Sequence, residues 1–341
     1  PPAAAEVMLG KWCADWGGNI LCAFAAQAVT LAAQGCVGLV ADKSILMRSS
    51  YEEFRRRVML GAAQPVALLD AGWGLLDDAC VEACGLVLRS GRAIGAWPRQ
   101  LASLDLREAG SSAVSLRSSL VLGGAGTSRV RRVATDLFCS LPHACIAYGI
   151  PECLSRAILG LPSLDPTSAR VRIGISPRNT ELFYRYQWEV VPSEIGVGRK
   201  WVPIANGGPY SPFYRSYDQV LLFSDHGARL KHYVSPGGHP ASCRSHDLQF
   251  TQGLSYGKRA FLLNVQFLPE GFAFTDEGQG IFPNEASDLW ALLATLNTSM
   301  VRALANTCCG QHKHSGYVKL LPVPDLATRG SELAALARGS H

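Results

Sequence analysis

The sequence contains few charged residues. Asp, Glu, Lys and Arg together make up 17% of the 341 residues, whereas hydrophobic residues make up 48%. A chain this poor in charge has enough apolar side chains to offset the entropy lost on folding, so disorder is excluded as the default. The excess of positive charge is small, with 32 Lys and Arg against 27 Asp and Glu. The net charge therefore permits a polyanionic partner without demanding one.

The sequence also lacks the usual marks of a secreted or membrane protein. Eleven cysteines is an odd number, and most of them lie in apolar runs, which favours free thiols in a reducing cytoplasm over a disulfide framework. Residues Ile20–Ala41 carry no charge, but Gln27, Gln34 and Gly35 interrupt the run, so we expect no membrane span. No charged-then-apolar leader with a cleavage site is present, so we expect no signal peptide and a cytoplasmic protein.

The metalloprotease motif HExxH is absent. The loop GGAGTS at residues 123–128 matches neither phosphate-binding glycine motif, so a flexible loop is the favoured interpretation. Cys308, Cys309, His312 and His314 are residue types that bind zinc. Adjacent cysteines cannot easily share one tetrahedral ion, so a helix end followed by a basic loop is favoured and no metal is expected there.

Residues 1–95 alternate helical and strand patterns, which predicts an α/β layer with a mostly parallel sheet. Leu21–Ala33 is Ala-rich and reads as a buried helix, and Ser49 and Ser50 open a second helical pattern. The predicted helices are Leu21–Ala33 and Ser50–Leu60, and the predicted strands are Cys36–Val40, Pro65–Leu69 and Cys80–Leu88.

The rest of the chain divides into segments that differ in composition and periodicity. Ser, Gly and Arg are frequent and periodicity is weak over 96–169, which we interpret as a connector. Residues 170–325 are rich in aromatics, Pro and Gly, with short strands predicted at Gln219–Phe223 and Phe261–Phe267 and one closing helix at Ala286–Ala305. This predicts a mixed α+β domain, followed by a tail at 326–341.

The segment Arg199–Arg215, RKWVPIANGGPYSPFYR, combines basic ends, four aromatics and a Gly-Gly pair. Basic side chains can contact phosphates, aromatics can stack on an unstacked base, and glycine lets the backbone approach closely. By itself this texture is more often a half-buried sheet with a solvated face.

The same segment opens an ordered series of motifs: GRKWVPIANGGPYSPFY, LFSDHGARLK, GLSYGKRAF, FLPEGFAFTDEGQGIFP, LLATLNTSMVRALAN and LLPVP. The series resembles the C-terminal half of the adenine-specific DNA methyltransferases of BREX and phage-growth-limitation (PglX-like) defence systems. These are relatives of the larger type II restriction-modification methylases. Upstream, NILCAFAAQAVTLAAQGCVGLVADKSILMRSSYEEFRRRV and LLDAGWGLLDDACVEACGLVLRSG resemble the helices and strands that follow the catalytic motif of these enzymes.

The sequence departs from this family at the catalytic centre. The glycine motif that binds the methyl donor is absent, and Pro1 and Pro2 are the only trace of the catalytic Asn-Pro-Pro-aromatic loop. Ala3 stands where the aromatic belongs, and Tyr256 replaces a Trp usual in the family. Methylation of an exocyclic amine needs an acceptor for its protons and an aromatic to hold the flipped base. We therefore expect the chain to be inactive alone.

The resemblance implies a partial methyltransferase-like (Rossmann-like) sheet followed by a mixed α+β target-recognition domain. It implies transfer of a methyl group from S-adenosylmethionine to adenine N6 in double-stranded DNA, with the donor not bound by this chain alone. The residues expected to contact DNA are Arg199, Lys200, Trp201, Gly207, Gly208, Tyr210, Tyr214, Arg215, Arg229, Lys231, Tyr256 and Lys258.

Two alternatives stay open. The chain is either a non-catalytic subunit that binds another defence-system protein, or one half of a split methyltransferase whose donor-binding half is a separate chain. High apolar content and modest net charge favour the first slightly.

Overall fold

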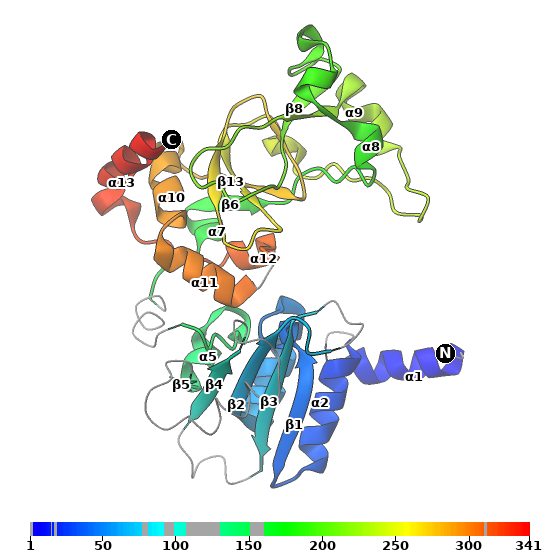
Figure 1. Cartoon of the computed structure of the whole chain (residues 1–341), viewed down its shortest axis with the longest axis vertical. Helices are drawn as coiled ribbons and strands as arrows, with labels where there is room; N and C mark the ends of the chain where they lie inside the picture. The colour runs from blue at the N-terminus through cyan, green and yellow to red at the C-terminus, as the bar shows by residue number, and fades with distance from the viewer. Residues whose placement is uncertain are drawn as a thin grey trace. The chain divides into compact units, whose positions relative to one another are not determined.

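The computed structural model describes residues 3–14, 16, 19–76, 81–91, 99–106, 130–150, 160–309 and 312–341 (Figure 1). Its internal contacts divide the chain into two compact units, Pro1–Gly160 and Leu161–His341. Each unit has its own sheets and its own buried side chains, so each is described by itself.

The first unit contains a five-stranded sheet in the order β1-β3-β2-β4-β5. Its strands are β1 (Cys36–Asp42), β2 (Ala63–Gly72), β3 (Ala83–Ser90), β4 (Gln100–Asp105) and β5 (Val130–Ala134). The three strands predicted in this part of the sequence are therefore confirmed, with β3 shifted toward the C-terminus.

The prediction of a mostly parallel sheet was wrong, because only the β2–β4 pair is parallel. β1 and β2 do run in the same direction, since both pair antiparallel with β3, which lies between them. The helical segment between β1 and β2 makes the expected crossover. The link from β2 to β3 spans only residues 73–82, shorter than the dozen or more residues that a parallel connection requires.

The helical elements of the first unit follow the sequence pattern closely. The Asn19 side chain accepts a hydrogen bond from the backbone N–H of Leu21 at 2.8 Å and caps α2, which packs beside β1 (Figure 1). No described helix is both long and apolar enough to span a bilayer. The helices are α1 (Ala3–Ala14), α2 (Ile20–Leu31), η1 (Lys43–Leu46), η2 (Ser49–Tyr51), α3 (Glu52–Phe54), η3 (Arg55–Ala62), α5 (Asp136–Ser140) and η5 (Pro142–Ala144).

The segment predicted as one helix at Ser50–Leu60 contains a π-helix, η3, and is organised around a buried arginine. Arg55 is fully buried, and its guanidinium donates hydrogen bonds to the carbonyl oxygens of Ile45, Arg48 and His143. A buried guanidinium is tolerated only when its donors are satisfied. Arg55 therefore ties the loops around η1 and η5 to η3.

Residues predicted as a connector at 96–169 contribute β4, β5 and α5 to the first unit, so this part of the prediction was wrong. The strands were missed because β5 begins with exposed Val130, Arg131 and Arg132, which show no apolar alternation. The boundary between the units falls at Gly160 and Leu161.

The second unit contains two four-stranded sheets, in the orders β11-β10-β13-β6 and β12-β8-β9-β7. The pairs are antiparallel except β12 with β8. Every residue of β8 and β10 is buried. The strands are β6 (Ala169–Arg172), β7 (Tyr184–Tyr186), β8 (Trp201–Ala205), β9 (Gln219–Leu222), β10 (Gly253–Gly257), β11 (Val265–Leu268), β12 (Ala273–Phe274) and β13 (Gly278–Pro283).

The strand predicted at Gln219–Phe223 is confirmed as β9, whereas the strand predicted at Phe261–Phe267 begins only at Val265. The Phe261 side chain is 86% exposed, so the start of that apolar run lies on the surface. The helical elements of the second unit are α7 (Leu164–Thr167), α8 (Thr180–Phe183), η6 (Gln187–Glu189), η7 (Pro192–Glu194), α9 (Ser224–Lys231), η8 (His246–Leu248), η9 (Ala286–Asp288), α10 (Leu289–Leu296), α11 (Ser299–Cys309), α12 (Ser315–Val318) and α13 (Leu326–Ser340).

The single helix predicted at Ala286–Ala305 is two helices, α10 and α11, separated at Asn297. The Asn297 amide donates hydrogen bonds to the carbonyl oxygens of Val265 and Leu293, and its Oδ1 accepts from the N–H of Val265. A side-chain amide that bonds backbone groups competes with the helical ladder. Asn297 therefore ends α10 and attaches it to β11.

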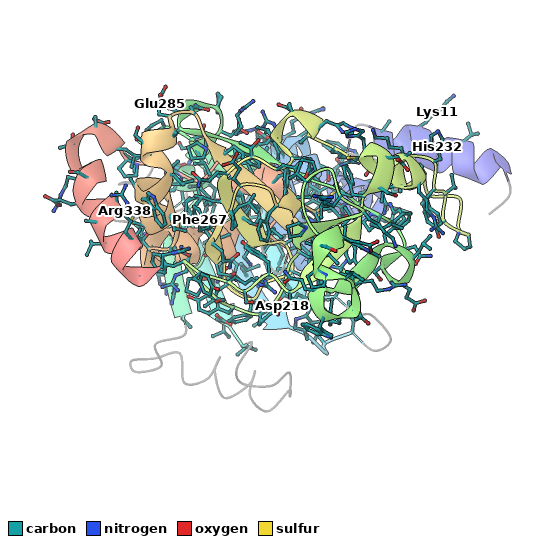
Figure 2. The ribbon with its side chains drawn as sticks, turned by 90° about the horizontal axis from the view of Figure 1, so that it is seen from above. Lys11, Asp218, His232, Phe267, Glu285 and Arg338 are labelled. Carbon is teal, nitrogen blue, oxygen red and sulfur yellow. The ribbon has the colours of Figure 1, made fainter. Side chains whose placement is uncertain are left out.

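The segment predicted as a tail forms helix α13, which packs against α10. Trp290 of α10 stacks on Phe267 at 5.2 Å, and the Arg338 guanidinium of α13 lies 5.8 Å from the centre of the Trp290 ring. Figure 2 labels Phe267 and Arg338 on these neighbouring elements. The tail prediction was wrong because the contacts that hold α13 come from distant residues.

Candidate nucleic-acid interface

Positive charge is concentrated in one part of the second unit. Residues 196–259 contain eight Lys or Arg and three Asp or Glu, an excess that equals the formal net charge of +5 for the whole chain. Arg199, Arg229 and Lys231 are exposed there, and none makes an ion pair within the described part of the chain. The Lys200 ammonium lies 3.5 Å from Glu194, an exposed pair that is weak in water.

Two aromatics expected to contact DNA instead belong to the core. Trp201 is 8% exposed, in the fully buried strand β8. Tyr256 is fully buried in β10, and its hydroxyl donates a hydrogen bond to Oε1 of Gln279 at 2.7 Å. Neither ring has a surface on which a base could stack, because every residue of β8 and β10 is buried and both faces of these strands are covered. Their predicted contact with DNA stays a prediction that their burial does not support.

The backbone at Gly207 and Gly208 lies close to other residues of the same unit. A Cβ on Gly207 would lie 2.7 Å from the carbonyl oxygen of Glu277, and one on Gly208 would lie 1.4 Å from Nη2 of Arg215. Arg215 donates from Nη2 to the carbonyl oxygen of Gly207 at 3.3 Å. The close approach inferred from the glycines is therefore made by Glu277 and Arg215.

Tyr210 and Tyr214 are exposed, at 46% and 54%. Tyr210 accepts a hydrogen bond from Arg302, and that guanidinium lies 5.9 Å from the centre of the ring. Tyr214 contacts the edge of the His341 ring. Both tyrosines therefore keep exposed ring surface, and their contact with DNA stays a prediction.

An exposed aromatic pair, two positions apart in the sequence, was not among the predicted residues. Tyr186 and Trp188 are stacked with ring centres 4.5 Å apart and planes 7° apart, and Trp188 is 72% exposed. Tyr186 also lines a hollow of about 260 Å³ beside Gly207, Gly208 and Asp218. The signal was visible as YRYQW, but nothing in it showed that the rings leave the core.

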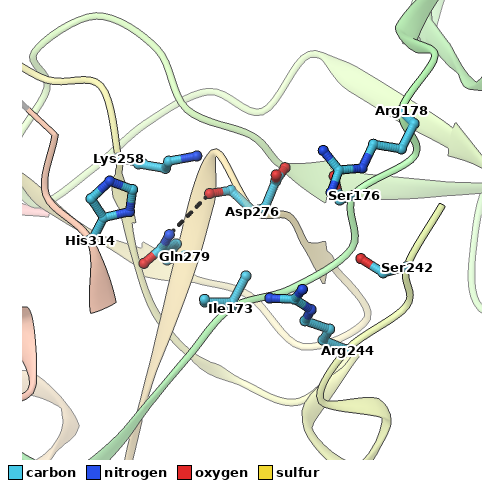
Figure 3. A pocket seen from close by; sticks show the side chains of 9 residues that line it. All are labelled: Ile173, Ser176, Arg178, Ser242, Arg244, Lys258, Asp276, Gln279 and His314. Carbon is cyan, nitrogen blue, oxygen red and sulfur yellow. Dashed lines mark hydrogen bonds between the residues drawn. The ribbon is translucent and has the colours of Figure 1, made fainter. Parts of the chain in front are cut away.

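A second hollow, of about 110 Å³, gathers basic side chains from distant segments (Figure 3). Its charged lining consists of Arg178, Arg244, Lys258 and Asp276. It also contains Ile173, Ser176, Ser242, Gln279 and His314. From the sequence, Lys258 of this lining was expected to contact DNA and His314 was considered for zinc. The Lys258 ammonium lies 3.1 Å from Glu277, which also pairs with Arg259 at 3.1 Å.

The residues considered for zinc do not form a site in the described part of the chain. No group of three or more His, Cys, Asp or Glu there could hold a metal ion. Burial and the nearby cations Arg259 and Lys258 lower the pKa of His312, which disfavours its protonation. The side chains of Cys308 and Cys309 lie outside what the structure describes.

In the first unit, buried charges serve the fold. The Lys43 ammonium lies 2.7 Å from Asp70 on β2, and the Tyr148 hydroxyl donates a hydrogen bond to the same carboxylate. Lys43 and Asp70 are both buried, so this network satisfies charges that would otherwise be costly. Pro1, Pro2 and the glycine loop 123–128 lie outside the described residues.

A hollow in the first unit bears on where a methyl donor could bind. Its hollow of about 80 Å³, lined by Leu60, Gly61, Ala63, Gln64, Pro65, Arg99, Thr135, Asp136 and Cys139, is small. Cofactor sites usually measure ~300–1,000 Å³. We therefore derive no catalytic step through a bound donor.

No protein-family model and no curated protein matches the sequence. Three solved structures align with the chain, two of them with a TM-score above 0.5. The type IIL restriction-modification enzyme MmeI, solved in complex with DNA, aligns with a TM-score of 0.60 at 10% identity, over 98% of this chain and 47% of MmeI. The chain therefore shares its fold with the aligned part of MmeI.

The other two structures align over similar lengths. The DrdV–DNA complex gives a TM-score of 0.51 at 10% identity, over 99% of this chain and 41% of DrdV. The type IIG restriction endonuclease BpuSI gives 0.37 at 11% identity, over 99% and 47%. The chain thus spans less than half the length of each structure. The mixed α/β class predicted from the sequence is confirmed.

Proposed function

We propose that the second unit binds double-stranded DNA and that this chain supplies the DNA-recognition portion of a restriction-modification or phage-defence methyltransferase. The observation that carries the proposal is the acid-poor segment 196–259, in which Arg199, Arg229 and Lys231 are exposed, on a fold shared with part of an enzyme solved on DNA. Exposed Lys and Arg bind the phosphate backbone and release its counterions.

Exposed aromatics support contact with bases as well as with phosphates. Tyr186, Trp188, Tyr210 and Tyr214 present ring surface to solvent on the same unit as the basic segment. Flat rings offer a stacking surface to bases, and basic side chains fix the register on the backbone.

The reaction we propose for the complete enzyme is methyl transfer from S-adenosylmethionine to adenine N6, as the resemblance to BREX and phage-growth-limitation methyltransferases implies. The donor would be bound by residues other than those described here, since the donor-binding glycine motif is absent from the sequence and the hollow near Leu60 is small. The chain alone is then expected to bind DNA without methylating it.

The test is fluorescence anisotropy of labelled duplex DNA with the full chain across a salt series. We expect affinity to fall steeply with salt and to exceed that for an acidic non-nucleic polymer. The double variant Arg199→Gln/Lys200→Gln should weaken binding to all sequences and lower the salt slope by about 1 to 2.

The matched control for that variant removes two arginines that already have acidic partners. Arg170 pairs with Asp247 and Arg329 with Glu332, so Arg170→Gln/Arg329→Gln removes the same charge with little effect on the slope. A folded chain without preference for DNA would refute the proposal.

A second candidate, half of a split methyltransferase, is favoured by an exposed apolar face in the first unit. Ile20, Phe24 and Leu31 recur at helical spacing on α2 and are 47%, 59% and 75% exposed. Val40 of the edge strand β1 is 61% exposed. Exposed apolar patches of this kind mark protein interfaces.

The split-enzyme candidate predicts assembly with a chain that carries the donor-binding glycine and Asn-Pro-Pro motifs. Light scattering after co-expression would detect the complex, and transfer of label from S-adenosylmethionine to DNA would report activity. Phe24→Glu/Leu31→Glu should prevent assembly and leave DNA binding intact. Assembly that survives this variant would exclude the α2 face, and assembly without DNA binding would favour a purely protein-binding subunit.

A further inference from the structure

The 110 Å³ hollow of the second unit is built from two backbone segments that pair with each other. Ser176 and Ser242 form an antiparallel bridge, with N–H···O distances of 2.8 and 2.9 Å between their backbones. Arg178 and Arg244 each lie two residues beyond these serines in the chain. The bridge therefore fixes the positions from which both guanidinium groups reach the hollow (Figure 3).

The backbone beside both arginines adopts an unusual conformation. Arg178 has φ of +62° and Ser245, next to Arg244, has φ of +53°. Residues other than glycine enter this left-handed region at a cost, and such positions cluster at binding sites. The strain is consistent with a geometry that serves to place the arginine side chains.

The charge of the lining is predominantly positive. Arg178 and Arg244 are exposed and form no ion pair within the described residues, whereas Lys258 is paired with Glu277. Asp276 is the one carboxylate of the lining, and its backbone carbonyl accepts a hydrogen bond from Gln279 at 3.1 Å. Two unpaired guanidinium groups that face one hollow repel each other. An anion between them would attract both and so offset this repulsion.

A buried hydroxyl points to the same ligand. Oγ of Ser242 is buried and has no hydrogen-bond partner within the described part of the chain. In Figure 3 this hydroxyl is directed toward the middle of the lining. A buried polar group without a partner is destabilising and calls for an explanation, such as a bound ion or ligand. An anion in the hollow would accept a hydrogen bond from this hydroxyl.

We propose that this hollow binds one phosphate group, held by the guanidinium groups of Arg178 and Arg244 and by the hydroxyl of Ser242. Arginine forks match the oxygens of phosphate in bidentate geometry. The volume of about 110 Å³ is only a few times the ~30 Å³ of a liquid water molecule, so it suits a phosphate group rather than a base. If the proposed function holds, the bound phosphate group belongs to the DNA backbone. The alternative is a phosphate group of a free small molecule.

The experiment compares the full chain with Arg178→Gln/Arg244→Gln and with the control Arg170→Gln/Arg329→Gln. Calorimetric titration with inorganic phosphate, against chloride at equal ionic strength, measures the free ligand. Anisotropy with duplex DNA across a salt series measures the backbone source. We expect the cavity variant to lose phosphate affinity at least about tenfold and to lower the DNA salt slope by about 1, since one phosphate is released.

Ser242→Ala separates ligand binding from folding. The hydroxyl has no hydrogen-bond partner among the residues that the structure describes, so its removal should leave the melting temperature unchanged or higher. Phosphate affinity should fall about tenfold, because the charge-assisted hydrogen bond is lost. A lower melting temperature with unchanged phosphate affinity would assign Ser242 to the fold and overturn its role as a ligand.

The outcomes separate this site from the proposed function. If the chain binds phosphate, the cavity variant loses this binding and neither protein binds DNA, the site is supported and DNA recognition is refuted. Phosphate binding lost with an unchanged DNA slope supports the site and assigns it to a free phosphate compound. DNA binding with no phosphate binding and an unchanged slope overturns the site and leaves DNA recognition standing.

Discussion

At the residue scale, glycines that suggest a ligand-binding loop turn out to be required by the chain itself. Gly207 faces the backbone of Glu277, and Gly208 faces the end of the Arg215 side chain. A backbone atom cannot move away without disturbing β13, whereas a guanidinium can rotate into solvent. The two neighbouring glycines therefore differ in what a methyl group would displace.

We expect Gly207→Ala to lower the free energy of unfolding by about 1–3 kcal/mol, the usual cost of overpacking. Gly208→Ala should cost less than about 1 kcal/mol, because Arg215 loses only a long hydrogen bond to Gly207. Urea unfolding of the two variants provides the measurement. Equal losses, or the reverse order, would contradict the assigned contacts.

At the scale of elements, one asparagine decides where a helix ends. The apolar pattern through Ala286–Ala305 continues without a break, yet the Asn297 side chain interrupts it by bonding both the N–H and the C=O of Val265. Helical periodicity carries no information on such a bond, because its partner lies 32 residues away in the sequence.

We expect Asn297→Ala to destabilise the protein by about 1–3 kcal/mol, since it leaves the buried N–H of Val265 unpaired, whereas the C=O of Val265 keeps the N–H of Phe213. Asn297→Asp should keep the hydrogen bond from the N–H of Val265 but lose the bonds that the amide donates. Its free energy of unfolding should lie between those of the wild type and Asn297→Ala. Hydrogen exchange should show faster exchange at Val265 than in the wild type. Unchanged protection at Val265 would show that the contact is not energetically important.

At the scale of the molecule, the two units have separate buried cores and separate polar networks. Lys43 and Asp70 belong to the first unit, while Gly207 and Glu277 belong to the second. A chain built in this way is expected to depart from two-state unfolding.

We expect scanning calorimetry to resolve two transitions that respond to different variants. Lys43→Met leaves the Asp70 carboxylate buried without its cation, which should cost about 3–5 kcal/mol in one transition only. Gly207→Ala should lower the other. A single transition shifted by both variants would show that the units unfold together.

The sequence alone determined the strands β1, β2, β3 and β9, the helix α2 and the mixed α/β class. These follow from local periodicity, capping and apolar runs, which depend on neighbouring residues. It also indicated the exposed basic residues of the second unit, because charge is costly to bury and usually stays on the surface.

The tertiary structure decided what depends on distant partners. Strand direction followed from the length of the link between β2 and β3, and α13 is held by Trp290 rather than left as a tail. Tyr256 is buried although its motif suggested a surface role. Arg178 and Arg244 lie 66 positions apart and meet only because Ser176 pairs with Ser242. Such a meeting is a long-range contact, and local sequence pattern does not encode it.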